Sequence, residues 1–105
     1  MKLLSCTGVA LIAYAIPALA GDLSVNQTYQ TFSPSNLKIH VGDSVTFRNG
    51  DTVTRNITVK PDEGDANDLG RQKPGGAVSY KFGTKGTYRI VCSIHPRMKM
   101  RVNAE

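Results

Sequence analysis

Apolar and polar residues alternate along several short stretches of this chain, and each stretch ends at a turn signal. Residues 37–41 alternate in this way, a Gly42-Asp43 turn follows, and the alternation resumes over residues 45–48. A period of two places successive side chains on opposite faces of a strand. The pattern therefore predicts a β-hairpin over residues 37–48, with one face buried.

The same period recurs in residues 57–59, 78–82, 88–92 and 100–102. Residues 60–76 are polar and rich in Gly, Pro and Asp, so we expect a long surface loop there. No segment shows the period of an amphipathic helix, and ten glycines, five prolines and no tryptophan also favour a turn-rich β fold. The expected class is all-β, an antiparallel sandwich or barrel.

The N-terminus reads as an export signal. Lys2 precedes an apolar run, and Ala18-Leu19-Ala20 forms a small-x-small cleavage signal before Gly21. The run is too short for a membrane span, which needs about 20 residues, although an N-terminal anchor or a buried helix would be the alternative. We expect a cleaved signal peptide at residues 1–20 and one domain at residues 21–105, exported to the periplasm, with no stable membrane anchor.

Size and charge exclude several classes of function. A domain of this length closes one small core, so a large multi-substrate enzyme is excluded. Because Lys2 leaves with the signal peptide, residues 21–105 carry 12 basic against 8 acidic residues, a net charge of +4. This mildly basic balance favours a partner with an acidic docking surface, and it is too weak to argue for nucleic acid.

After export only one cysteine remains, because Cys6 lies in the signal peptide. A lone cysteine in an oxidising compartment pairs with another molecule, reacts, or binds something, and metal ligation is one way to protect it. Cys92, His95 and Met98 follow one another at three-residue steps. Thiolate and thioether are soft donors, and with an imidazole they select copper over magnesium, calcium or manganese.

Each of these residues also has a simpler interpretation. Met98 is a possible core residue, and His95 a possible polar neighbour of Cys92. A Cys/His pair can also act as a nucleophile and its base. The sequence shows no oxyanion donors or third orienting group for that chemistry, so we expect no enzyme.

The chain resembles the small cupredoxins, the type I blue-copper family of plastocyanin, pseudoazurin and amicyanin. The resemblance is carried by residues 32–34 with 37–49, residues 55–59, and residues 82–102, where the C-x-x-H-P-x-M spacing is amicyanin-like. It implies a Greek-key β-sandwich in which Cys92, His95 and Met98 occupy three of the four copper-ligand positions.

The resemblance also exposes a departure. The fourth ligand of such proteins is a histidine directly before an asparagine, and here Arg55 precedes Asn56. Arginine stays protonated and has no lone pair for a metal. A shifted alignment, with Arg55 as a solvated loop residue, is the alternative. His40 does not replace the missing ligand, because the cupredoxin arrangement places it at the opposite end from Cys92.

Two outcomes follow for the site. Copper binds through Cys92, His95 and Met98, in a set that suits Cu(I) better than Cu(II). Alternatively, Arg55 fills the fourth position, no metal binds, and the guanidinium stabilises the Cys92 thiolate as a reactive or partner-binding group.

The sequence leaves three alternative functions open: electron transfer, handling of Cu(I), and an accessory role with a vestigial copper site. Amicyanin belongs to methylamine oxidation and accepts electrons from methylamine dehydrogenase. The resemblance therefore implies that an accessory relative assists assembly of that enzyme or of its tryptophan-derived quinone cofactor. The expected partner is a periplasmic redox or copper-handling protein.

Overall fold

The computed structural model describes residues 22–105, so the predicted signal peptide at residues 1–20 lies outside the described residues. Strands build all the regular structure of residues 22–105. One sheet has four strands, in the order β3 (Thr31–Ser33), β2 (Asp22–Thr28), β5 (Ser44–Asn49) and β8 (Ala77–Lys81). The other has five, in the order β4 (Asn36–Ile39), β10 (Lys99–Ala104), β9 (Gly86–Val91), β6 (Arg55–Pro61) and β7 (Asn67–Gln72).

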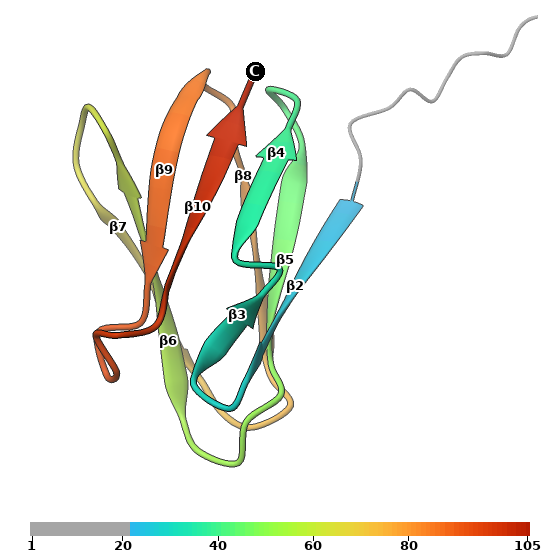
Figure 1. The fold of residues 1–105 in the computed structure, drawn as a ribbon, viewed down its shortest axis with the longest axis vertical. Helices are drawn as coiled ribbons and strands as arrows, with labels where there is room; N and C mark the ends of the chain where they lie inside the picture. The colour runs from blue at the N-terminus through green and yellow to red at the C-terminus, as the bar shows by residue number, and fades with distance from the viewer. Residues whose placement is uncertain (1–21) are drawn as a thin grey trace, which may run out of the picture.

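The two sheets pack face to face around one apolar core (Figure 1). Both sheets contribute fully buried side chains, among them Val25, Phe47, Ile57, Ile90 and Val102. The alternating residues of the sequence supply these inward-facing positions, which confirms the expected all-β sandwich. Each sheet also contains one parallel pair, β4 with β10 and β2 with β5, beside its antiparallel pairs.

The predicted hairpin over residues 37–48 is wrong. β4 and β5 both exist, but they lie in different sheets, and the turn between them carries the chain from one sheet to the other. The N–H of Asp43 donates to the carbonyl of His40 (3.0 Å), and the Asp43 carboxylate accepts the N–H of His40 (2.9 Å). Alternation specifies only that each strand has one apolar face. Two strands can bury these apolar faces from facing sheets as well as side by side in a hairpin, so the pattern does not distinguish the two arrangements.

The predicted loop over residues 60–76 contains a strand. β7 pairs antiparallel with β6 at the edge of the five-stranded sheet, with an irregularity between Asn56 and Thr58. Its side chains are mostly exposed, with Leu69 half-buried and Gln72 buried. An edge strand whose side chains are mostly exposed carries no apolar alternation, which is why the pattern of the sequence did not reveal it.

His40 and Cys92 lie at opposite ends of the sandwich. His40 follows Ile39, which pairs with Ala104, and Ala104 in turn pairs with Gly86, the first residue of β9. Cys92 follows the last residue of β9. The expectation that His40 lies at the opposite end from Cys92 is thus confirmed, because about 20 Å of strand separates them at about 3.3 Å per residue. Within residues 22–105, no helix is long and apolar enough to cross a membrane.

Candidate metal centre

The loop of residues 92–98 joins β9 to β10 at one end of the five-stranded sheet (Figure 1). Its backbone is folded by three hydrogen bonds: the N–H of His95 donates to Cys92 O (3.2 Å), that of Met98 to His95 O (2.9 Å), and that of Cys92 to Met98 O (3.3 Å). Each three-residue step of the motif is therefore a tight turn. Through the backbone, each candidate donor residue is hydrogen-bonded to the other two.

The two sulfur-bearing side chains of this loop are buried, and the imidazole is partly exposed. Cys92 is 0% and Met98 1% exposed, and both belong to the core. Cys92 is a free thiol. His95 is half-buried, and its neighbour Ile94 is an exposed apolar side chain. The soft donors thus lie in a water-poor interior, and the imidazole lies at the surface.

Asn56 holds the loop from the neighbouring strand β6. It is 3% exposed, and its side-chain Oδ1 accepts the N–H of Ser93 (2.8 Å), the hydroxyl of Ser93 (3.0 Å), the N–H of Ile94 (3.3 Å) and the thiol of Cys92 (3.4 Å). In the sequence, Asn56 serves only as a marker of the alignment, and this role was not predicted. The signal that could have revealed it is a polar amide directly before the alternating residues 57–59 of this strand.

Arg55, the first residue of β6, is buried and ion-paired. It is 5% exposed, and its Nε donates to Oδ2 of Asp51 at 3.0 Å. The alternative of a solvated loop residue is therefore wrong. The Asp51 carboxylate also accepts the N–H of Tyr29 (2.6 Å) and that of Gln30 (3.3 Å), so it ties the β5–β6 loop to the turn between β2 and β3.

The surroundings of Asp51 keep it negatively charged. Burial by itself raises the pKa of its carboxyl, but the backbone N–H groups of Tyr29 and Gln30, with the hydrogen bond and charge of Arg55, outweigh burial and lower that pKa below its ordinary value. The carboxylate thus neutralises the buried guanidinium, which would be costly to leave unpaired. Within residues 22–105 the hydrogen bond and ion pair of this guanidinium go to Asp51 and none goes to the 92–98 loop.

Buried amides bridge the two sheets beside Arg55. Gln72 lies opposite Arg55 in the register of β6 and β7. Its Nε2 donates to Phe47 O (2.7 Å), and its Oε1 accepts Nε2 of Gln27 (2.6 Å). Nδ2 of Asn49 donates to Gln72 O (3.0 Å).

The Phe47 carbonyl fixes the orientation of this amide pair, because it requires the nitrogen of Gln72. Gln72 therefore presents its oxygen to Gln27, and Gln27 must present its nitrogen. The remaining oxygen, Oε1 of Gln27, is buried without a hydrogen-bond partner in the part of the chain that the structure describes.

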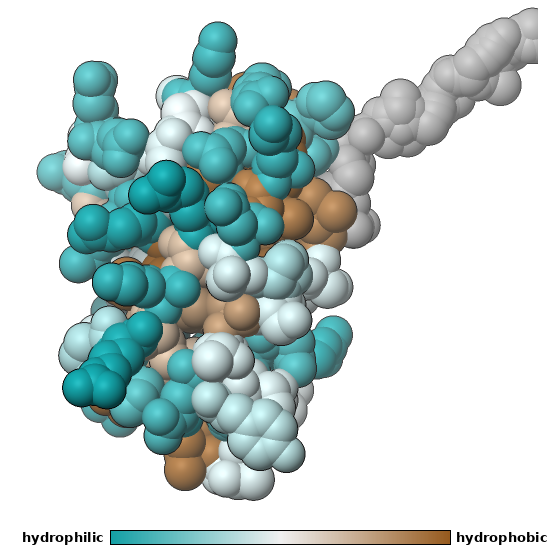
Figure 2. Space-filling model, in the orientation of Figure 1, coloured by the Kyte–Doolittle hydropathy of each residue, from teal (hydrophilic) through white to brown (hydrophobic). Residues whose placement is uncertain are grey.

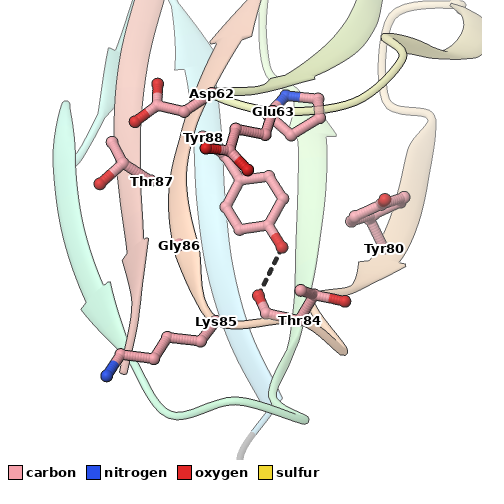
Figure 3. Close-up of a pocket in the computed structure, with 9 residues that line it drawn as sticks. Asp62, Glu63, Tyr80, Thr84, Lys85, Gly86, Thr87 and Tyr88 are labelled. Carbon is pink, nitrogen blue, oxygen red and sulfur yellow. Dashed lines mark hydrogen bonds between the residues drawn. The ribbon is translucent and has the colours of Figure 1, made fainter.

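A cavity of about 570 Å³ lies at the other end of the sandwich (Figure 3). Its lining includes Tyr80, Tyr88, Asp62 and Glu63, and the hydroxyl of Tyr88 donates to the carbonyl of Thr84. Burial, with the nearby Tyr80, raises the pKa of Tyr88. No residue of the 92–98 loop lines this cavity, so it is not part of the candidate centre.

The side chains of the 92–98 loop have the donor chemistry of a copper site. Residues 22–105 contain no group of three or more His, Cys, Asp and Glu side chains that could hold a metal ion. The 92–98 loop supplies Cys92 and His95 and adds the thioether of Met98, and a thiolate, imidazole and thioether set is characteristic of copper. Arg55 has no lone pair to complete this set.

Comparison with known proteins identifies the class. Residues 19–105 match the copper-binding proteins of the plastocyanin/azurin family. The chain belongs to this family, and its two-sheet sandwich is the cupredoxin fold. The expectation that the chain is not an enzyme agrees with that membership.

Within this family, the chain is similar to an amicyanin and to a methylamine utilization protein. The chain is 30% identical to amicyanin-alpha of Methylorubrum extorquens over 102 residues, covering 91% of this chain and 86% of that protein. It is 29% identical over 91 residues to the methylamine utilization protein MauL of the same organism, covering 87% and 80%.

Solved structures show the same architecture. A purple cupredoxin from Nitrosopumilus maritimus superposes with a TM-score of 0.71 and 26% identity, covering 79% of this chain and 99% of that one. A mutant of amicyanin in the reduced state gives a TM-score of 0.74 and 27% identity, covering 84% and 86%.

Proposed function

We propose that this protein is an exported, periplasmic cupredoxin that binds copper through Cys92, His95 and Met98 and acts in electron transfer or copper handling. The observation that supports it most is the backbone of the 92–98 loop, in which hydrogen bonds link the three donor residues pairwise. Preorganisation of this kind lowers the cost of ordering the ligands. Family membership supports copper as the metal.

The donor set favours the lower oxidation state of copper. Two sulfurs and one imidazole suit Cu(I), whereas Cu(II) prefers more nitrogen or oxygen donors. A bound copper ion would supply one-electron chemistry or serve as cargo. The chain itself holds the two sulfurs in the core and places the imidazole of His95 at the surface, beside the exposed Ile94. A partner can approach the centre from that side.

An accessory role without metal is the second candidate. It is supported by the buried pair of Arg55 and Asp51, because the resemblance predicts the fourth ligand at residue 55 and a paired guanidinium cannot bind a metal. In this alternative, the similarity to MauL supports a role in methylamine utilisation. We infer for it a function in assembling methylamine dehydrogenase or its tryptophan-derived quinone cofactor.

Copper titration distinguishes the candidates. Residues 21–105, which include both sheets, are titrated with Cu(I) and Cu(II) while stoichiometry and visible absorption are measured. Colourless one-to-one Cu(I) binding indicates copper handling, and an intense thiolate-to-copper band with reversible redox cycling indicates electron transfer. Binding no stronger than that of Cys92→Ser contradicts the metal proposal and supports the accessory role.

A matched pair of methionine variants tests the donor set. Met98→Leu keeps a buried apolar side chain but removes the thioether, and we expect it to weaken Cu(I) binding. Met100→Leu changes the same atom type at a buried position outside the loop and should leave copper affinity unchanged. Equal affinities of the two variants would exclude Met98 as a ligand.

A further inference from the structure

Four cations lie next to one another on the outer face of the five-stranded sheet. Arg101 of β10, Arg89 of β9 and Lys60 of β6 are directly opposite one another in the strand register, and Lys99 precedes Arg101 by two residues on the same face. All four side chains are exposed. No acidic side chain of residues 22–105 forms an ion pair with any of them. We call Lys60, Arg89, Lys99 and Arg101 the basic face.

This arrangement opposes folding. Residues directly opposite in neighbouring strands have Cβ atoms about 4.5–5.5 Å apart, and like charges in such positions destabilise a sheet. The fold does not require cations there, since any polar side chain suits an exposed strand position. Asp68 faces the same side, opposite Thr58, but its carboxylate accepts the N–H of Gly70 instead. Charges that oppose folding and lack internal partners point to an external anion.

The basic face borders a groove that leads toward the candidate metal centre. The groove has a volume of about 490 Å³, and Lys60, Arg89 and Lys99 lie along it with Val91 and Thr58, which pair across β9 and β6. Its lining continues through residues 92, 93 and 96 of the ligand loop. Figure 2 shows hydrophilic side chains gathered over β9 and β10. Anything bound in this groove would lie beside the loop that carries the copper donors.

An acidic protein segment fits this surface better than the other polyanions. Proteins that bind single-stranded nucleic acid stack bases on aromatic side chains, and the described lining contains none. Segments that insert into a membrane surface present exposed apolar side chains, whereas Val91 in the groove is half-buried. Carboxylates pair with arginine in bidentate geometry, and a partly apolar floor can hold the alkyl parts of a peptide.

We propose that the basic face is a docking site for an acidic segment of a partner protein. Its carboxylates pair with Lys60, Arg89, Lys99 and Arg101, and its chain follows the groove toward the 92–98 loop. The purpose of docking rests on the proposed function, because a docked partner would lie beside the proposed copper centre. The binding itself requires no metal.

The test uses the exported protein without added metal and a fluorescent oligoglutamate peptide, with affinity measured by anisotropy. The variant combines Lys60→Gln, Arg89→Gln and Arg101→Gln. At roughly threefold per exposed ion pair, we expect the peptide to bind about 30-fold more weakly. The Tm should be unchanged or higher, because three facing like charges are removed.

A control triple makes the same change in net charge elsewhere. Arg48→Gln, Lys73→Gln and Lys81→Gln are exposed positions outside the basic face. Peptide affinity in this variant should stay within about twofold of the wild type, apart from a general salt-screened effect.

Four results would overturn the proposal: no saturable binding by the wild type, an equal loss in both triple variants, tighter binding to phosphatidylglycerol vesicles or duplex DNA than to the peptide, or a lowered Tm in the basic-face variant. The last would show that the cations serve the fold. Because no copper is present, failure of the copper titration leaves these results interpretable.

Discussion

Arg55 is a buried charge next to Asn56, the residue that holds the ligand loop. A guanidinium cannot ligate a metal, and its burial is tolerated because Asp51 supplies a compensating carboxylate at 3.0 Å. The two residues therefore form a unit, since either one alone would leave a buried charge without its partner. Substitutions that test this position must change both.

The first prediction concerns a restored copper site. Arg55→His with Asp51→Asn removes the ion pair as a unit and supplies an imidazole, so we expect a thiolate-to-copper band to appear or to strengthen on addition of Cu(II). Arg55→Gln with Asp51→Asn is the control, because it removes the same charges without a strong donor. If the histidine variant matches this control in spectrum and copper affinity, residue 55 is not at the fourth ligand position.

The second prediction concerns acid stability. The pKa of Asp51 is lower in the folded protein than its ordinary value of about 3.9. Its contribution to stability is therefore fully present above pH 4 to 5, and is lost as the pH falls through the unfolded pKa toward the folded one. Urea unfolding between about pH 6 and pH 2.5 should show this loss in the wild type, and the double variant Asp51→Asn with Arg55→Gln should show a flatter dependence. Parallel curves would contradict the role of this carboxylate.

At the scale of elements, the ligand loop is held by two kinds of contact. Its own backbone closes two turns and joins the two ends of the loop, and Asn56 of β6 fixes its first half from outside. The three-residue spacing predicted the first kind, because turns of that length are local. The second depends on β6 and β9 being neighbours, and the sequence pattern did not specify that pairing.

The third prediction tests this external contact. Asn56→Ala leaves the N–H groups of Ser93 and Ile94 without their acceptor, so their amide hydrogen exchange should accelerate. The free energy of unfolding should fall by about 0.5–1.5 kcal/mol, the net contribution of a typical hydrogen bond, because these N–H groups are only partly buried. Asn56→Asp keeps an acceptor oxygen and should protect the Ser93 amide better than alanine does. Unchanged exchange in Asn56→Ala would show that Asn56 does not hold the loop.

At the scale of the whole molecule, the two sheets meet through an apolar core and through the buried amides of Gln27, Gln72 and Asn49. These polar residues lie near Arg55, at the end of the sandwich where apolar packing gives way to loops. Gln72 makes contacts with both sheets, since it is in β7 and donates to Phe47 O of β5.

The fourth prediction ranks two substitutions in this contact. Gln72→Leu leaves Nε2 of Gln27 without its acceptor and removes the side-chain hydrogen bond to Phe47 O, whereas Gln27→Leu leaves only Oε1 of Gln72 unpaired. At about 1–3 kcal/mol per unsatisfied group, Gln72→Leu should be the more destabilising variant in urea unfolding. The reverse order would mean that the orientation of the two amides is wrong.

The sequence alone determined which residues face the core in most strands, because a period of two is a local consequence of strand geometry. It also determined the soft donor set, since spacing and residue type are local properties. That Cys92, His95 and Met98 hold copper, and that Arg55 replaces a ligand, remain predictions.

Only the tertiary structure decided which strands are neighbours. It sent β4 and β5 to different sheets, paired β7 at an edge, buried Arg55 against Asp51, and aligned the basic face across three strands. A strand with one apolar face can pair with any of several other strands, so the pairing that forms depends on how all the strands pack together. Contacts between distant segments follow from that choice, and no local pattern encodes them.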